Sequence, residues 1–372
     1  VYRSTDDGMS WERISPDLTT DSAAWQQQEE SGGLTPDVTG AENYTTIYTI
    51  AVSPVEEGVI WAGTDDGNVQ VTRDGGESWT NVQGNMPGKP RHSWVSHIEA
   101  SKHRTGTAYA AVHDYMRGDW TTYVYRTTDY GQSWTRLPGQ EVDGFARTVE
   151  EDPENPNLLW LGTEFGLFYS LDRGQSWEEW SHGFPSGVPV RALATQTQEH
   201  ENDLVVGTYG RGAYVIDDIT PLRAMTGDPS LLHADLHVFE PGPTIEHVVA
   251  PPKVYRFDGS AMYEGDNETY GATVTIAAHV PDSLARGGRP GGGMEGGPDE
   301  GGGQEAEYPY TQVESAPDTT APVPTKEATF QVLRGDSVIQ ESDITLEEGL
   351  NRHTWRFDTE GAATFPRSIE EL

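Results

Sequence analysis

Short runs of alternating apolar and polar residues dominate roughly the first 220 positions of the chain. In the clearest stretch, this alternation predicts strands over 47–53, 59–63, 68–72 and 78–82, with Gly, Pro or Asp between them. Four short strands joined in sequence order form an antiparallel meander, the unit from which a propeller blade is built. The pattern therefore predicts one complete four-stranded sheet in this stretch.

The same arrangement recurs along the first half of the chain. Two further sets of four strands are expected at 95–100, 108–112, 122–127 and 133–137, and at 146–150, 158–162, 167–170 and 176–180. The N-terminus supplies two strands, over 1–3 and 11–14, and 190–217 supplies three. We therefore expect an all-β propeller portion over 1–225, with three complete and two partial blades near 1–20, 44–85, 93–140, 145–182 and 188–219.

An eight-residue pattern, Ser/Thr-x-Asp-x-Gly-x-x-Trp, occurs four times, once in each of the first four repeats. Its Asp can accept hydrogen bonds from backbone N–H groups within a tight turn, and its Gly supplies a positive φ. Its Trp begins the next strand with a large apolar surface. We expect structural roles and burial for these residues: Asp6, Trp11, Asp74, Trp79, Asp129, Trp134, Asp172 and Trp177.

The pattern changes after Pro221. A proline-containing linker is expected over 226–254, followed by strands over 272–279, 328–333, 337–341 and 351–357. Alternating strands of this length predict an incomplete Ig-like β-sandwich over 255–372. The Gly-rich and Pro-rich composition of 286–325 cannot bury a core, so an inserted loop is expected there.

The charge balance excludes one class of partner. The chain carries 60 acidic and 24 basic residues, a formal net charge of −36. Nucleic acid binding requires a basic surface, so no nucleic acid partner is expected. Only four lysines are present, which together with the acidity suggests adaptation to high salt, although an ordinary acidic surface is the alternative.

Several other features bound the chemistry. The chain has no cysteine, which removes disulfides and thiolate chemistry, and its sequence shows no membrane span. No cofactor is expected. The chain begins at Val1 within a repeat, so we expect the remaining blades to lie in a longer parent chain.

The repeated turns resemble the BNR repeat, or Asp-box, of sialidases, sortilin-type receptors and several glycoside hydrolases. More specifically, the segments at 14–19, 59–67, 161–167, 207–212 and 217–222 resemble large bacterial exported proteins termed sortilin N-terminal-like, and often labelled glycosyl hydrolase-like. The resemblance implies a β-propeller followed by an Ig-like module. It also implies a periplasmic, cell-surface or extracellular location, and the composition suggests a halophilic source.

Strand order predicts where a ligand site lies. Because successive strands run in opposite directions, the four Asp turns share one rim, and the turns after second and fourth strands share the other. Polar, acidic and aromatic residues gathered on this second rim, the propeller mouth, are typical of a binding site. The candidates are Asp65, Asp66, His113, Asp114, Tyr115, Arg117, Glu164, Phe165, Tyr209 and Arg211.

Two functions from different classes are compatible with this site. The first is a non-enzymatic exported binding or scaffolding module for a protein, peptide or glycan. The alternative is a glycoside hydrolase, with a carboxylate pair drawn from Asp65, Asp66, Asp114, Asp119 and Glu164 and a mouth completed by blades outside this chain. Sialidase-type chemistry would use Tyr209 and Arg211, but no further arginines can be assigned to it. Strand alternation separates the nearby histidines, so no metal site is expected.

Overall fold

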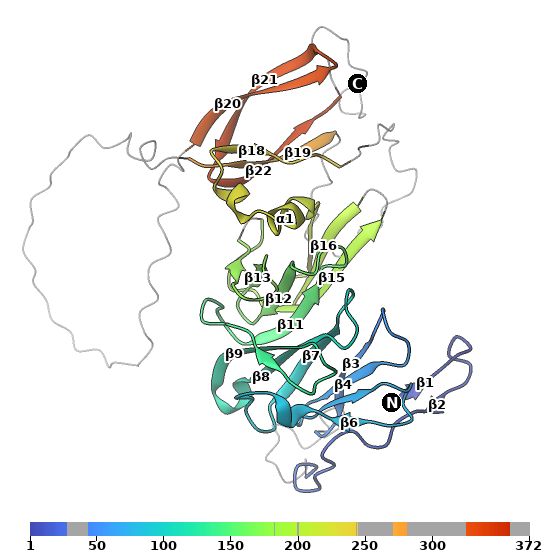
Figure 1. Ribbon diagram of the computed structural model, residues 1–372. Helices are drawn as coiled ribbons and strands as arrows, with labels where there is room; N and C mark the ends of the chain where they lie inside the picture. The colour runs from blue at the N-terminus through green and yellow to red at the C-terminus, as the bar shows by residue number, and fades with distance from the viewer. Residues whose placement is uncertain are drawn as a thin grey trace, which may run out of the picture. The chain divides into compact units, whose positions relative to one another are not determined.

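The computed structural model describes residues 1–27, 44–181, 183–198, 201–242, 244, 271–280 and 325–357. The chain divides into two compact units, Val1–Asp228 and Pro229–Leu372. Strands make up nearly all of the regular structure in the described residues (Figure 1). This confirms the all-β class predicted from the alternating pattern.

Three complete four-stranded antiparallel sheets form the body of the first unit, and in each the strands are neighbours in sequence order. The outer strands are two residues long because the Asp turn occupies the residues before them. The bounds are β3 (Ile47–Val52), β4 (Ile60–Thr64), β5 (Val69–Thr72) and β6 (Thr80–Asn81); β7 (Trp94–Ala100), β8 (Ala108–Asp114), β9 (Asp119–Thr127) and β10 (Thr135–Arg136); β11 (Ala146–Glu151), β12 (Leu159–Thr163), β13 (Leu167–Ser170) and β14 (Glu178–Glu179).

Two partial sheets flank these three. At the N-terminus β1 (Tyr2–Arg3) pairs with β2 (Glu12–Arg13), and after the third complete sheet β15 (Val190–Gln198), β16 (Glu201–Thr208) and β17 (Ala213–Ile216) form a three-stranded sheet. A short helix that the sequence pattern did not predict, α1 (Thr220–Met225), then follows. Its Arg223 forms a buried ion pair at 2.9 Å with Asp152, which follows β11.

The sheets stack face to face, with their first strands side by side. Strand β7 contacts both β3 and β11, and β11 contacts β15 (Figure 1). One apolar core, centred on Trp61 and Trp134, lies between the first and second complete sheets. Another, centred on Leu161 and Trp177, lies between the second and third complete sheets. Antiparallel meanders packed in this way are the arrangement of a β-propeller.

A glycine in the second strand allows the first and the third complete sheets to approach the next sheet. A Cβ on Gly63 would lie 2.5 Å from Val95 Cγ1, and a Cβ on Gly162 would lie 2.5 Å from Val190 Cγ1. The corresponding Gly207 has no such neighbour, since its nearest atom would be Ala192 Cβ at 3.4 Å. The glycines at the ends of β4 and β12 are therefore required for close packing between sheets. Among the described residues, the equivalent Gly207 in the last sheet has no side chain of a following sheet packed against it.

The four Asp turns close with the same hydrogen bonds. In the second, the Thr72 hydroxyl donates to Asp74 Oδ1 at 2.7 Å, and the N–H and hydroxyl of Ser78 donate to the same carboxylate at 2.9 and 2.5 Å. The Ser78 hydroxyl, the Ser78 N–H and the Thr72 hydroxyl hold the pKa of Asp74 well below its usual range. A serine that the eight-residue pattern left undefined precedes every Trp and makes these contacts: Ser10, Ser78, Ser133 and Ser176.

The expectation that all four turn tryptophans are buried is wrong for one of them. Trp134 and Trp177 are buried and Trp79 is half-buried, but Trp11 is 64% exposed. The indole N–H groups of Trp79 and Trp177 donate to Ile14 O and Pro138 O, carbonyls at the end of the preceding sheet. Trp11 belongs to the first of the four turns, between β1 and β2.

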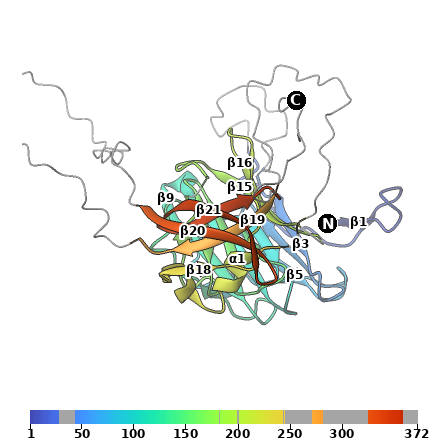
Figure 2. The ribbon, with the colours of Figure 1, turned by 90° about the horizontal axis from the view of Figure 1, so that it is seen from above.

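The described residues of the second unit form two small sheets. Strands β18 (Leu236–Val238), β19 (Ala272–Ala278) and β22 (Gly349–Trp355) form one, and β20 (Thr325–Arg334) and β21 (Ser337–Glu347) form a long hairpin (Figure 2). An apolar cluster of Ile276, Ala278 and Leu346 lies between them.

Part of the region expected to be a linker is structured. A 3₁₀ turn at Pro229–His233 and β18 lie within 226–254, and β18 pairs with β19. The sequence pattern missed β18 because it is only three residues long. The proposed Gly-rich loop over 286–325 lies outside the described residues, except for Thr325, which begins β20. The Ig-like assignment stays a prediction.

Candidate functional site

The first strands of the sheets, β3, β7, β11 and β15, are called the inner strands. Each has a β-bulge near its start, at the mouth end of the sheet. The register shifts lie between Ile47 and Thr49, Val95 and His97, Ala146 and Thr148, and Val190 and Ala192. Bulges redirect a side chain out of the regular alternation. Three residue types occupy the bulges: Tyr48, Ser96, Arg147 and Arg191.

Asp65 and Asp66, two of the predicted mouth residues, are buried and hydrogen-bonded. Asp65 accepts from the N–H and hydroxyl of Thr46 at 2.7 and 2.8 Å, and Asp66 accepts from Thr20 N–H at 2.7 Å. Burial raises the pKa of Asp65. The Lys89 ammonium donates to Gly67 O at 2.9 Å, and burial lowers its pKa to about 8. These groups hold the loops beneath the mouth.

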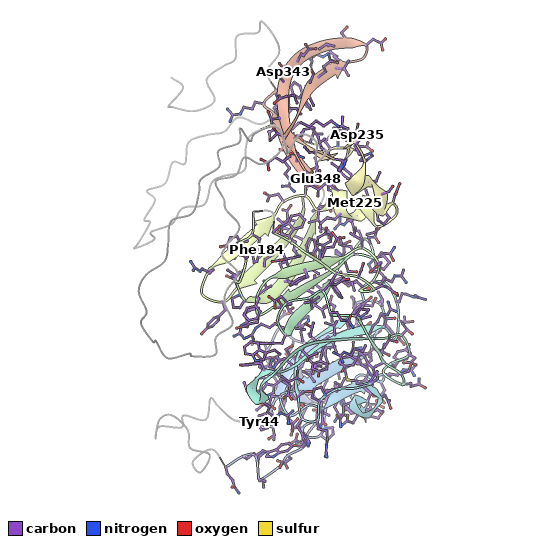
Figure 3. The ribbon with its side chains drawn as sticks, turned by 90° about the vertical axis from the view of Figure 1, so that its left-hand side faces the viewer. Tyr44, Phe184, Met225, Asp235, Asp343 and Glu348 are labelled. Atoms are coloured by element: carbon purple, nitrogen blue, oxygen red, sulfur yellow. The ribbon has the colours of Figure 1, made fainter. Side chains whose placement is uncertain are left out.

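A first pocket of about 310 Å³ opens beside these loops, and we call it the Trp94 pocket. Within it Arg117 Nε donates to Asp114 Oδ1 at 2.7 Å, so opposite charges face one another beside apolar walls. Tyr44 and Phe184, both in connections between sheets, lie along one side of the unit (Figure 3). The pocket is lined by Trp25, Tyr44, His92, Trp94, His113, Asp114, Met116 and Arg117.

His113 is the most deeply buried polar residue of this pocket. Its side chain is 3% exposed, its ring is stacked on Trp94 at 5.7 Å, and its Nδ1 has no hydrogen-bond partner among the described residues. Burial, and then the charges of Arg147 and Arg191, lower the pKa of His113 to about 4. The imidazole is therefore neutral at pH 7 and can accept or donate a hydrogen bond.

Aromatic rings continue from this pocket across the mouth in an unbroken sequence that we call the ring series. Neighbouring ring centroids are 4.4–6.3 Å apart, within the range of favourable aromatic contact. Tyr115 is stacked on Phe145 at 4.4 Å, and Trp120 on Phe165 at 5.9 Å. The series comprises Trp25, Tyr44, Trp94, His113, Tyr115, Phe145, Trp120 and Phe165.

A second pocket of about 350 Å³ lies at the other end of the ring series, and we call it the Trp120 pocket. Gly144 has φ +79°, and a Cβ there would lie 2.9 Å from the Phe165 ring. This glycine therefore lets Phe165 lie beside Trp120. The pocket is lined by Trp120, Thr121, Thr122, Gly139, Val142, Asp143, Gly144 and Phe165.

The remaining predicted residues lie in neither pocket. Glu164 is paired with Arg147, whose Nε donates to it at 2.6 Å. Tyr209 is 67% exposed, and the Arg191 guanidinium lies 4.9 Å from its ring. Arg211 is exposed. The structure thus brings His113, Asp114 and Arg117 together, joins Tyr115 and Phe165 to them through rings, and leaves Tyr209 and Arg211 apart.

Sequence reasoning missed most of the aromatic residues of the mouth. Trp94 directly precedes a predicted strand, and Trp120 lies at the start of β9, so aromatic residues at strand ends were a usable signal. Arg147 lies inside a predicted strand, and its bulge could not be read from alternation. Trp25 and Tyr44 come from connections with no regular pattern.

A separate charged group lies at the opposite end of the inner strands. The Lys102 ammonium lies 2.8 Å from Glu99 Oε1 and 2.7 Å from Glu150 Oε1, and Glu150 also accepts from Thr195 N–H at 3.2 Å. These contacts join β7, β11 and β15. Burial, and then the Glu150 charge, raise the pKa of Glu99 to about 7.

The described part of the chain lacks two other kinds of feature. It holds no group of three or more His, Asp or Glu side chains arranged to hold a metal ion. None of its helices is long and apolar enough to cross a membrane.

Comparisons with known proteins give partial likenesses, and no family model matches the chain. Ninety-four residues are 31% identical to the oligoxyloglucan-reducing end-specific xyloglucanase of Emericella nidulans, covering 25% of this chain and 11% of that enzyme. An ancestral GH74 enzyme has a TM-score of 0.41 at 16% identity, over 59% of this chain and 27% of the other. A YCF48 protein bound to D1 peptide has a TM-score of 0.33 at 16% identity, over 47% and 56%. The chain spans less than two thirds of each of these proteins.

Proposed function

We propose that residues 1–228 are a non-enzymatic binding module of an exported protein, with its ligand site at the propeller mouth. The observation that carries this proposal is the ring series, which joins two pockets on the rim opposite the Asp turns. Exposed and half-buried aromatic rings supply large contact areas at low entropic cost. The ligand is a protein, a peptide or a glycan.

The carboxylates of the mouth support binding rather than catalysis. A glycosidase requires one carboxyl as acid and another as nucleophile or base, both directed at the bond to be cleaved. Asp65 and Asp66 are buried against Thr46 and Thr20, Asp114 is paired with Arg117, and Glu164 is paired with Arg147. Each of these four groups already has a structural partner.

The alternative function, glycoside hydrolysis, is favoured by the stretch of 31% identity to a xyloglucanase. It would require a carboxylate pair completed by further sheets. Incubation of the protein with aryl glycosides and polysaccharides tests it: turnover that is abolished by Asp114→Asn, with an unchanged melting temperature, would replace the binding proposal by the hydrolase.

We propose in addition that the parent protein supplies further sheets of the same repeat. Two features support this. Alternate residues of β3, Tyr48, Ile50 and Val52, are exposed, and so is Trp11. At the other end, the space beside Gly207 is unfilled, whereas the equivalent glycines are covered by valines. A parent protein whose inter-sheet contacts end at these same residues in an experimental structure would contradict the proposal.

The charge of −36 supports a further proposal, that the protein works at high salt. Screening weakens repulsion between carboxylates, so the melting temperature should rise between low and molar salt. A flat or falling series would leave an ordinary acidic surface as the explanation.

The binding proposal is tested by screening the protein against glycan and peptide arrays and measuring hits by calorimetry. Trp94→Ala should weaken binding about tenfold or more, since aromatic anchors dominate binding energy. Tyr209→Ala is the matched control, because Tyr209 is an exposed aromatic residue of the same rim outside the ring series. Equal affinities for both variants would contradict the proposed site.

A further inference from the structure

We infer that the Trp94 and Trp120 pockets are two subsites of one extended site, and that its ligand is an uncharged glycan chain of several sugar units. This inference rests on the proposed function, because it assigns a ligand class to the same rim. It is carried by the continuity of the rings between the pockets and by the pairing of charges beside them.

The two pockets are connected through side chains in direct contact. From Trp94 the rings run through the buried His113 and the half-buried Tyr115 to Trp120, with centroid steps of 5.7, 5.0 and 6.3 Å. Trp120 is 52% exposed and Phe165 38% exposed, and their planes are within 6° of parallel. They therefore present apolar ring surface to solvent at the far end of the series.

Charge pairing favours an uncharged ligand. In the Trp94 pocket, the Asp114 carboxylate and the Arg117 guanidinium neutralise one another at 2.7 Å, and the buried His113 imidazole is neutral. Between the pockets, Arg147 is paired with Glu164, and its guanidinium lies 4.5 Å from the Phe145 ring. An anionic or cationic ligand would have to break these pairs or leave them competing for it.

The same groups suit a sugar in particular. Sugar rings present C–H groups on their faces and hydroxyls at their edges, so they combine apolar contact with hydrogen bonds around the rim. The apolar side chains that line the two pockets, among them Trp94 and Trp120, provide the first. Asp114, Arg117 and His113 in one pocket, and Asp143 and Thr121 in the other, provide donors and acceptors.

A peptide is the competing occupant. A peptide bound by strand addition would need an exposed strand edge, whereas a proline-rich peptide in the polyproline II conformation would need only an aromatic-lined groove. The mouth is formed by turns and by the ends of strands, which disfavours strand addition. The titrations below distinguish a glycan from a proline-rich peptide.

The test is the dependence of affinity on ligand length. Neutral β-linked glucan, mannan and xylan oligosaccharides from two to eight units are titrated calorimetrically against the wild-type protein, Trp120→Ala and Tyr209→Ala. In the wild type, affinity should rise about tenfold or more once the oligosaccharide reaches both pockets. Trp120→Ala should remove that rise and leave the affinity for the shortest bound oligosaccharide unchanged. Tyr209→Ala should retain the rise in affinity with length.

The outcomes separate the two proposals. Peptide binding without oligosaccharide binding would overturn the glycan inference and leave the binding module standing. Oligosaccharide binding with the same length dependence in Trp120→Ala would overturn the second subsite. Preference for uronic acid or amino sugar oligomers over neutral ones would overturn the assignment of an uncharged ligand. Turnover of the oligosaccharides would overturn the non-enzymatic function itself.

Discussion

The two rims of the propeller unit differ in how far they repeat. On one rim the same turn occurs four times, with the same Ser or Thr, Asp, Gly and Ser making the same hydrogen bonds. On the other rim, equivalent bulge positions hold Tyr48, Ser96, Arg147 and Arg191. Features required by every sheet recur, whereas features required once do not. The rim of the Asp turns is thus explained by the needs of folding. The mouth, whose residues vary between sheets, is the rim at which we expect the function.

The largest effect should come from the tryptophans of the repeating rim. Trp177→Ala removes a buried indole and its hydrogen bond to Pro138 O, and should lower the free energy of unfolding by about 3–5 kcal/mol. Trp11→Ala is the matched control, since Trp11 is 64% exposed, and should change it by less than about 0.5 kcal/mol. Denaturant unfolding of both variants checks this, and similar losses would contradict the packing explanation.

The glycines between sheets should give the next largest effect. Gly162→Ala places a Cβ 2.5 Å from Val190 Cγ1, and overpacking of this kind costs about 1–3 kcal/mol. Gly207→Ala meets nothing nearer than 3.4 Å and should be close to neutral. The comparison of the two melting curves measures how tightly adjacent sheets are fitted. An equal loss in Gly207→Ala would show that the last interface is not open.

Removal of a turn carboxylate should cost less. Asp74→Ala leaves the Ser78 N–H and the Thr72 and Ser78 hydroxyls without their acceptor, and should lower the melting temperature by less than Gly162→Ala because the exposed turn groups can bond to water. Asp74→Asn retains one acceptor oxygen and should lose less. An Asp74→Ala protein with wild-type stability but altered ligand binding would move function to the repeating rim.

The Glu99 cluster provides a test by pH. The folded-state pKa of Glu99, about 7, is above its ordinary value, so its favourable contribution to stability is present at low pH and is lost as pH rises through 7. Glu99→Gln should therefore raise the melting temperature by about 2–4 °C at pH 8 and have little effect near pH 4. Melting temperatures across this range check the sign. Destabilisation at pH 8 would show that the pairing of Glu99 with Lys102 outweighs burial.

The smallest effect on stability is expected at the mouth. Met116→Ala removes a side chain that is 58% exposed in the Trp94 pocket and should change the free energy of unfolding by less than about 0.5 kcal/mol. A measurable loss of ligand affinity at unchanged stability would complete the contrast between the rims. A loss of stability in Met116→Ala as large as that in Asp74→Ala would contradict the contrast between the rims.

The sequence predicted the sheets well because alternation and turn residues act locally. The strands around Trp61 and Leu161 were placed by alternation, and the Asp74 turn by its residue types. The aromatic residues of the mouth were harder to predict, because they come from separate segments that only the folded chain brings together. Asp65 and Asp66 were predicted as site residues but are buried anchors, whereas Trp94, just before the strand predicted over 95–100, was not singled out but lines a pocket.

The bulge of each inner strand has an evolutionary consequence. It places one side chain per sheet outside the regular alternation at the mouth end. Tyr48 is half exposed there, the Ser96 hydroxyl donates to Ala146 O of the next sheet, and the buried Arg147 is paired with Glu164. One backbone geometry thus accommodates a ring, a hydroxyl and a guanidinium without a change of strand pairing, which makes these positions natural starting points for divergence, or for engineering a new specificity.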